Sequence, residues 1–584
     1  MKLFSKELTR KQVIVLVGLT LLLLLPNVAL IFQFYGLLTG FSLFFMALAI
    51  LCLPMLVLPL RWAFLVHGVF LLLLPLDVAS WVGMHQPITE GFVNSIWFTN
   101  RAELSELLPQ FIKPLLFFVA CLLLYFYLVL RVLPAGVRFA QKVRLKVLLP
   151  LVLLGFFLFS PFGNEELRPF AFEQTYSFHQ YHLALKWTFN HVFPFDIIRR
   201  SFALKRHIDK LHKMKSDRYL EFKIGDVGYN PQDSLIGVFV IGETSRACNW
   251  QLAGYARKTN PRLARRRNLY FFDDVFTGAN YTRYAVPMLL STASPDDMYR
   301  WRNSPMLTEL LAQTTYKRGW ISNQNIGEHL LVPSSLDCDY KRELKWELQD
   351  VYDEMLLPYV SEFLDVVTIP QMLFVHTLGG HYAYTERYTK AFAQFQPDLA
   401  NFKAEEGEDP YWVIRLGGKD VPGFVNSFDN TILYTDMVLD SVISFVEAKH
   451  KPAFVIYVAD HGENLLEPPE YRAYHSYDTP SHYEAHVPYF IWLSDEYLAR
   501  YPQADSLLRA HLHLPVQSTV TFHTLLDLTR VRYALYDSTQ SLLSPHFTPL
   551  ATRPIINPDG KLKPEPTYPA EGGVCPVYNR RQRK

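Results

Sequence analysis

Two apolar segments of the sequence, LIGVFVIG and AFVIYVA, each end in side chains that can bind a metal ion. Glu243 follows the first segment, and Asp460 and His461 follow the second. Carboxylates and imidazoles are common zinc ligands, and Gly462 behind them lets the backbone turn tightly. The pattern predicts one metal site built from distant parts of the chain. The simpler alternative for Glu243 is a carboxylate that only caps the next helix.

A hydroxyl group suited to attack on phosphorus lies in the segment TGANYTRYAVPM. We expect a strand over residues 269–276, a turn through Gly278 and Asn280, and a helix that begins near Thr282. A hydroxyl in that place faces the positive end of the helix and its free N–H groups, which favours a phosphoryl group. The alternative is an ordinary N-cap threonine.

Continuous apolar segments alternate with helical patterns in the part of the chain that carries these residues. This alternation predicts an α/β domain with a mainly parallel sheet covered by helices on both faces. Ligands of such sheets bind at the carboxyl ends of the strands, where Glu243, His376 and the pair Asp460 and His461 lie. The expected strands are 235–242, 268–276, 318–323, 371–377, 453–460 and 489–494, and the expected helices lie near 305–314, 342–363, 427–449 and 516–529.

The first part of the chain predicts an α-helical membrane domain. Half of all residues are hydrophobic and only 19% are charged, and the apolar excess falls in stretches long enough to span a bilayer, about 20 residues each. Few ionisable residues interrupt them, so they indicate an anchor rather than a transporter. Residues 84–110 are too polar to span and predict an external loop. The five expected spans are 12–32, 38–60, 62–83, 111–133 and 146–162.

The Lys and Arg residues of the short loops predict the orientation and the domains. Positive charges gather at the N-terminus, at Arg61 and over residues 131–146, and such loops prefer the cytoplasm. The domain prediction is therefore a five-helix transmembrane domain over 1–163, a linker over 164–230 with interfacial amphipathic helices or a plain connector, and an α/β domain outside the cytoplasm over 231–584.

Charge and cysteine content limit the partners and crosslinks. A net charge of +2 gives no reason to expect a nucleic-acid partner, and the basic run at 262–268 predicts a solvated helix face. Cys248, Cys338 and Cys575 lie in the outer part, where they allow at most one disulfide with one thiol left over.

The segment VFVIGETSRACNWQLAGYARKTNPRL resembles the opening of the lipid-using phosphoethanolamine transferases, membrane members of the alkaline phosphatase and sulfatase superfamily. The similarity continues through YTRYAVPMLLS, FVHTLGGHYAYTERY, FDNTILYTDMVLDSVI and YVADHGEN, in the family's order, across nearly all of residues 235–495. The resemblance implies a five-helix membrane domain followed by a sheet that carries its metal at the carboxyl edge.

Applied to this sequence, the resemblance implies that Glu243, Thr282, Asp460 and His461 bind one zinc ion. Thr282 is also the implied nucleophile. Zinc bound to its Oγ would lower the pKa of the hydroxyl and hold it in line with phosphorus.

The resemblance also implies histidines that contact substrate. His381 matches a family histidine that contacts the substrate phosphate and can protonate a leaving oxygen, with a purely structural histidine as the alternative. Three further candidates follow the DHGE motif: His475, which fits the family context best, His482 and His486. Asn280 and His482 are the additional substrate-binding candidates, and a second metal near His381 and His475 stays open.

The implied function is transfer of phosphoethanolamine from phosphatidylethanolamine to an envelope glycolipid, either lipid A or the lipopolysaccharide core, with release of diacylglycerol. The expected location is a bacterial inner membrane with the catalytic domain in the periplasm, and the expected state is a monomer. One alternative is a glycerol-phosphate transferase of the lipoteichoic acid synthase type, which prefers manganese. A sulfatase or phosphodiesterase-like hydrolase, and a binding protein with a dead site, complete the alternatives, although none of the four implied ligands is missing.

Overall fold

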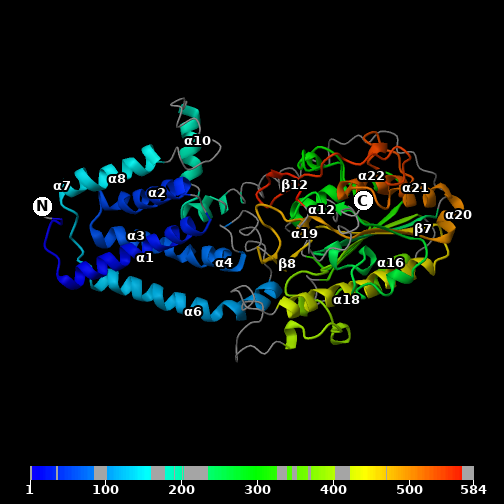
Figure 1. Cartoon of the computed structure of the whole chain (residues 1–584), viewed down its shortest axis with the longest axis horizontal. Helices are drawn as coiled ribbons and strands as arrows, with labels where there is room; N and C mark the ends of the chain where they lie inside the picture. Colours follow the sequence, from blue (N-terminus) through cyan, green and yellow to red (C-terminus); the bar gives the residue numbers. More distant parts are fainter. Residues whose placement is uncertain are drawn as a thin grey trace. The chain divides into compact units, whose positions relative to one another are not determined.

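The chain divides into two compact units, Met1–His207 and Ile208–Lys584, which are described separately. Figure 1 shows the computed structural model. The structure describes residues 3–34, 37–84, 88, 101–159, 178–189, 191–199, 201–202, 205, 234–324, 338–344, 352–365, 370–401, 421–468 and 470–567.

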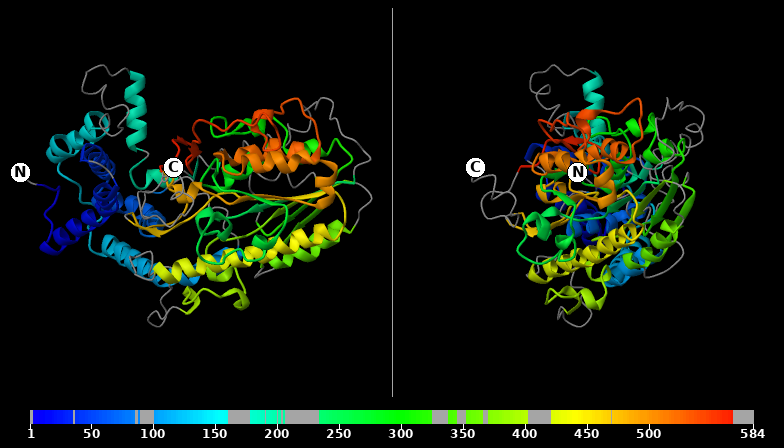
Figure 2. Two further views of the ribbon diagram at one scale, coloured as in Figure 1. Left: turned by 45° about the vertical axis from the view of Figure 1, so that its right-hand side comes forward. Right: turned by 90° about the vertical axis from the view of Figure 1, so that its right-hand side faces the viewer.

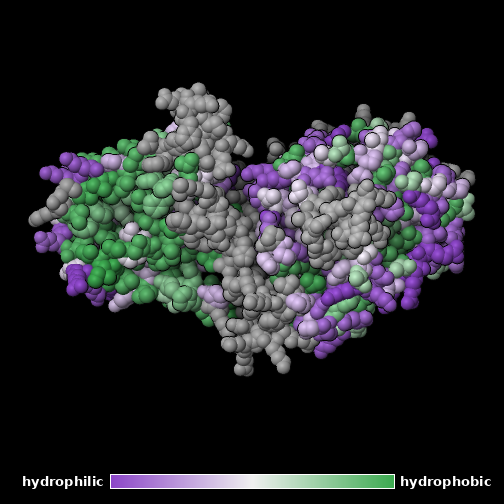
Figure 3. Space-filling model, in the orientation of Figure 1, coloured by the Kyte–Doolittle hydropathy of each residue, from purple (hydrophilic) through white to green (hydrophobic). Residues whose placement is uncertain are grey.

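The first unit is built from long apolar helices, and hydrophobic residues dominate the visible face of this unit in Figure 3. Four stretches of the described residues are long and apolar enough to cross a membrane: Arg10–Val28, Leu38–Met55, Leu60–Ser80 and Pro114–Arg131. The helices are α1 (Arg10–Phe34), α2 (Leu37–Met55), α3 (Leu60–Phe70), α4 (Leu74–Met84), α6 (Arg101–Arg131) and α10 (Phe178–Phe189), with short α and π segments between Gln141 and Phe159.

Two expectations for this unit change. The expected external loop 84–110 is wrong at its end, because α6 begins at Arg101: the sequence RAELSELLPQ is polar but favours a helix, which continues into the apolar stretch. The fifth expected span, 146–162, meets a helical run that alternates between α and π geometry up to Phe159, and the rest of that span lies outside the described residues. The total of five spans therefore stays a proposal.

The second unit contains a mixed seven-stranded sheet in the order β2-β10-β7-β1-β6-β4-β5. β1 pairs in parallel with β6 and β7, and β4 pairs in parallel with β5 and β6, whereas β10 runs antiparallel to both β2 and β7. The expected mainly parallel sheet thus contains one reversed strand. The strands are β1 (Ile236–Gly242), β2 (Leu269–Phe272), β4 (Lys317–Ser322), β5 (Tyr340–Glu343), β6 (Gln371–His376), β7 (Ala453–Ala459) and β10 (Tyr489–Leu493).

The sequence patterns merged two strands and missed a third, β5, so the expected helix near 342–363 is wrong at its start. The expected strand 268–276 divides into β2 and β3 (Val275–Phe276), and β3 pairs with β11 (Val516–Gln517) in a separate small sheet. The sequence YKRE of β5 has no continuous apolar run, because the strand pairs only with β4, at the end of the sheet order, and is half-buried.

Helices cover both faces of the sheet, as the sequence predicts, and Figure 2 shows the two helical layers. Alternate residues of β1 enter different cores: Phe239 and Ile241 pack with α12 (Thr282–Leu290) and α22 (Thr521–Thr529), whereas Val238 and Val240 pack with α16 (Leu357–Leu364) and α18 (Val421–Glu447). This alternation follows from the two-residue period of a strand.

Acidic residues of α18 hold the segment that follows the carboxyl end of β1. Asp429 accepts hydrogen bonds from Asn249, Tyr255 and Arg257 at 2.6–2.9 Å. Asp440 and the exposed Glu447 pair with Arg266. The expectation of a solvated helix face over 262–268 is wrong for Arg266, whose side chain is only 16% exposed.

The cysteines agree with the limit set by the sequence. Cys248 is disulfide-bonded, whereas Cys338 is not part of a disulfide. Cys575 lies outside the described residues.

Removing the Asp436 carboxylate should destabilise the second unit. Its two oxygens accept the backbone N–H groups of Arg262 and Leu263, both at 3.0 Å, and the residue is fully buried. In Asp436→Ala both donors lose their acceptor, which should cost roughly 2–4 kcal/mol. Thermal unfolding of the full-length chain in detergent should show a fall of several degrees.

Glu447→Ala is the matched control on the same helix. Glu447 pairs with Arg266 but is 58% exposed, so its loss should change stability by less than about 1 kcal/mol. If both substitutions lowered the stability equally, the buried Asp436 carboxylate would not be the group that holds this segment.

Candidate active site

The metal-type side chains meet because their strands are neighbours. β1 and β7 are parallel and Gly242 lies opposite Ala459, so the residues that follow each strand come together at one edge of the sheet. Ligand atoms of Glu243, Asp460 and His461 all lie within 4.8 Å of one another, and all three side chains are buried.

Distances within this cluster suit a shared cation. His461 Nε2 lies 3.4 Å from Glu243 Oε1 and 3.4 Å from Asp460 Oδ2. The Asp460 Oδ1 atom accepts the backbone N–H groups of Thr244 and His461, at 3.1 and 2.7 Å. Asp460 Oδ2 is buried and has no hydrogen-bond partner among the described residues. A buried carboxylate oxygen of this kind fits a metal ligand.

Backbone contacts orient the imidazole. His461 Nδ1 lies 3.0 Å from the carbonyl oxygen of Gly462. Donation from Nδ1 to that carbonyl leaves the Nε2 lone pair directed at the carboxylates, as in many metal-binding histidines. Gly462 is needed for a close approach, because a Cβ there would collide with the carbonyl oxygen of Tyr483.

Thr282 joins the cluster from a third element. It is the first residue of α12, and the N-cap position belongs to Tyr281, whose side chain makes no capping bond. Thr282 Oγ1 lies 3.2 Å from His461 Nε2 and donates to Glu243 Oε2 at 3.3 Å. The hydroxyl therefore faces the predicted ligands rather than capping its own helix.

Electrostatics make the cluster unfavourable without a cation. Burial, and next the charge of Asp460, raise the pKa of Glu243 well above its usual range. Burial lowers the pKa of His461, so the imidazole is neutral near pH 7. Two carboxylates, a neutral imidazole and a hydroxyl form a donor set that suits a divalent metal such as zinc.

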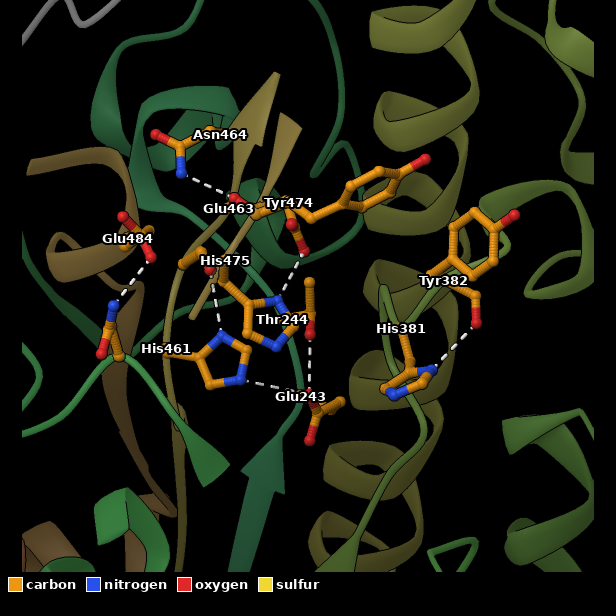
Figure 4. A network of polar contacts seen from close by, with 12 residues as sticks. Glu243, Thr244, His381, Tyr382, His461, Glu463, Asn464, Tyr474, His475 and Glu484 are labelled. Atoms are coloured by element: carbon orange, nitrogen blue, oxygen red, sulfur yellow. Dashed lines mark hydrogen bonds and ion pairs between the residues drawn. The ribbon is translucent and has the colours of Figure 1, made fainter. Parts of the chain in front are cut away.

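His475 lies against this cluster, as Figure 4 shows. Its ring centroid is 3.9 Å from that of His461, and its Nδ1 lies 3.3 Å from Glu463 Oε2. Burial lowers the pKa of His475. Of the three histidines that follow the DHGE motif, His475 is thus placed beside a predicted ligand.

His381 lies on the loop after β6, which rests on the backbone of Glu243: Gly380 donates its N–H to the Glu243 carbonyl oxygen at 3.0 Å. His381 Nδ1 lies 2.9 Å from the carbonyl oxygen of Tyr382. Both residues are visible beside Glu243 in Figure 4.

The remaining candidates, Asn280, His482 and His486, contact residues of the neighbouring loops. Asn280 donates its amide to Glu484 Oε1 at 2.8 Å and to the Tyr477 carbonyl oxygen at 2.9 Å. His482 packs against Tyr483 with ring centroids 3.6 Å apart, and burial lowers its pKa to about 2. His486 Nε2 lies 3.0 Å from the carbonyl oxygen of Asp273. These contacts give all three residues a part in holding the loops around the cluster.

Sequence reasoning missed Gln324. Its side-chain amide donates to Glu243 Oε2 at 3.2 Å and to the carbonyl oxygen of Thr377 at 3.1 Å. Gln324 follows the carboxyl end of β4, so the rule that placed ligands at strand ends could have found it.

Comparisons with known proteins agree with this geometry. A family model described as Sulfatase matches residues 236–531. Phosphoethanolamine transferase EptC of Escherichia coli strain K12 is 27% identical over 332 residues, which are 55% of each chain. Phosphoethanolamine transferase EptA of Salmonella typhimurium strain LT2 is 27% identical over 333 residues, covering 53% of this chain and 55% of the relative. The match therefore spans about half the length of these relatives.

Solved structures extend the similarity to the fold. The C-terminal periplasmic domain of EptC from Escherichia coli matches with a TM-score of 0.52 at 27% identity, covering 59% of this chain and 96% of that domain. The integral membrane protein EptA from Neisseria meningitidis matches with a TM-score of 0.66 at 21% identity, covering 91% and 98%. The predicted resemblance is confirmed, as is the order of a helical unit followed by a sulfatase-like α/β domain.

Metal binding to this site should release protons. In the metal-free protein, burial and the charge of Asp460 raise the pKa of Glu243 and so favour its protonated form, and a metal must displace that proton. Zinc affinity should therefore rise with pH up to the Glu243 pKa. Calorimetric titration of the full-length chain with zinc at pH 7, in two buffers of different ionisation enthalpy, should give different heats.

A Glu243→Gln variant provides the control. It should bind zinc more weakly and release no proton from this position. Identical heats for the unchanged protein in both buffers, with affinity independent of pH, would contradict the protonated state assigned to Glu243.

Proposed function

The chain belongs to the sulfatase family, and we propose that it is a zinc-dependent transferase that moves phosphoethanolamine from phosphatidylethanolamine to an envelope glycolipid. The observation that carries this proposal is the position of Thr282 Oγ1, 3.2 Å from His461 Nε2 and 3.3 Å from Glu243 Oε2. A threonine hydroxyl among metal-type ligands at a helix N-terminus is suited to covalent phosphoryl transfer. The names of the relatives support the ethanolamine headgroup.

Glu243, Asp460 and His461, together with the Thr282 hydroxyl, would hold the zinc ion. When bound, zinc would supply Lewis-acid chemistry that lowers the pKa of the Thr282 hydroxyl. The proposal also allows a second metal ion to bind near His381 and His475 during turnover.

In the first step, Thr282 Oγ gives its proton to bulk water and attacks the phosphorus of phosphatidylethanolamine. The new bond joins Oγ to phosphorus, and the bond from phosphorus to the diacylglycerol oxygen breaks. That oxygen takes a proton from His381 and leaves as diacylglycerol, while His475 contacts the substrate. The positive end of the α12 dipole stabilises the charge on the phosphoryl oxygens.

In the second step, a hydroxyl of the acceptor attacks the same phosphorus. The histidine that lost its proton takes one from this hydroxyl. The bond from phosphorus to Thr282 Oγ breaks, and that oxygen takes a proton from bulk water, which restores the threonine. We propose lipid A or the lipopolysaccharide core as the acceptor, a bacterial inner membrane as the location, and a monomer with its catalytic domain in the periplasm. The proposed domain limits are 1–163, 164–230 and 231–584.

The topology can be tested without enzyme activity. Because positive loops prefer the cytoplasm, a reporter fused after Lys584 should be active only when it is a type that works in the periplasm. The same reporter fused after Leu133 should give the opposite result, because an odd number of spans separates the two positions in the five-span proposal. A cytoplasmic signal from the Lys584 fusion would overturn it.

Thr282 separates an enzyme from a binding protein. Incubation with donor lipid and no acceptor should leave a phosphoethanolamine group on the peptide that contains ANYTRYAVPM, detected by mass spectrometry. Thr282→Ala should retain the fold yet lose transfer by several powers of ten, as loss of one member of a catalytic set commonly does. Thr282→Ser keeps an oxygen and should keep part of the activity.

Thr292→Ala is the matched control, since Thr292 follows the same helix and bonds to Ser304 Oγ at 2.9 Å. This variant should transfer phosphoethanolamine nearly normally. Near-normal transfer by a folded, zinc-loaded Thr282→Ala protein would disprove the covalent mechanism.

A further inference from the structure

We propose that Asp353 and Arg387 are positioning residues that together hold the His381 loop, residues 378–382, against the backbone of Glu243. The inference rests on the proposed function, in which His381 contacts the substrate phosphate. It assigns a role in the reaction to two residues that the sequence patterns did not single out.

The Asp353 carboxylate holds the start of the His381 loop. Its Oδ1 accepts the backbone N–H of Leu378 at 2.9 Å, and its Oδ2 accepts that of Gly379 at 2.8 Å. The Asn323 side chain donates to Oδ1 at 3.0 Å, and Asp353 is 6% exposed. Hydrogen bonds from amides to a buried charged group are stronger than neutral ones, so the carboxylate fixes two successive residues of the loop.

Arg387 holds the other end of the loop. Its Nε donates to the carbonyl oxygen of His381 at 2.9 Å and its Nη2 to that of Tyr382 at 3.1 Å. Burial raises the pKa of Asp353, and the positive charge of the Arg387 guanidinium opposes this shift. Hydrogen bonds to the loop backbone before His381, and to the carbonyl groups of His381 and Tyr382, thus hold His381 in place.

Two glycines bring this loop onto the metal-ligand backbone. Gly379 has a φ of +52°, and a Cβ there would collide with the carbonyl oxygen of Glu243. A Cβ on Gly380 would lie 2.5 Å from the carbonyl oxygen of Thr244. Because nothing separates the loop from these residues, a small shift of the loop changes the distance between the His381 imidazole and the nucleophile, to which transfer rates are sensitive.

A buried carboxylate elsewhere in the same unit provides the comparison for a purely structural role. Asp429 is fully buried and accepts bonds from Asn249, Tyr255 and Arg257. Its contacts hold the segment after β1 rather than the His381 loop. Asp429→Asn should therefore reproduce the stability cost of changing a buried carboxylate, without an effect on His381.

The experiment compares Asp353→Asn and Asp429→Asn in the full-length, zinc-loaded chain. Hydrogen exchange by mass spectrometry should show that the amides of residues 378–380 exchange roughly 10-fold faster or more in Asp353→Asn, and at the wild-type rate in Asp429→Asn. With phosphatidylethanolamine as donor, release of diacylglycerol should show kcat lowered roughly 10–100-fold in Asp353→Asn, with a smaller change in KM.

The His381→Ala background gives the decisive readout. If Asp353 acts through His381, Asp353→Asn should lower kcat less than about 2-fold in a chain that already carries His381→Ala. Arg387→Lys keeps the charge but cannot bond both carbonyl groups, so it should behave like Asp353→Asn and serves if that variant does not fold.

Unchanged exchange of residues 378–380 in both variants would overturn the inference, as would equal loss of kcat with and without His381. A wild-type chain that does not cleave the donor lipid, but whose loop exchanges faster in Asp353→Asn, would refute the proposed function and leave the positioning of the loop supported.

Discussion

The repulsion between two buried carboxylates is the constraint on which the second unit depends. Glu243 and Asp460 follow adjacent parallel strands, so the sheet register that forms the core also forces their charges together away from water. Burial and mutual charge raise the pKa of Glu243, and such a pair is stable only when a proton or a cation offsets it. The strand order therefore brings together three side chains that could hold a cation.

The surrounding contacts make the donor atoms rigid before any ligand arrives. One oxygen of Asp460 is used by backbone N–H groups and the other faces the cluster, while the Gly462 carbonyl fixes the His461 ring. Preorganised donors need little rearrangement when charge develops on a phosphoryl group. Thr282 then receives its position from the start of α12 rather than from the sheet.

Buried acids hold the loops that the strands leave at this edge, and they do so by accepting backbone or side-chain donors. Asp429 and Asp436 hold the segment after β1, and Asp353 holds the loop after β6. The GYARKT part of the family motif belongs to this supporting set, because Tyr255 and Arg257 bind Asp429. Part of the similarity to the transferases therefore records how the loops are supported, and part records the ligands themselves.

The sequence by itself determined the apolar strands, the helical first unit and the positions of Glu243, Asp460 and His461, because hydrophobic periodicity and strand-end polar residues are local features of the chain. It did not determine the reversed direction of β10, the edge strand β5 or the contact of Gln324 with Glu243. These depend on which distant segments become neighbours. The family context favoured His475 among the three histidines after the DHGE motif, but only the packing of the chain brings its ring within 3.9 Å of that of His461.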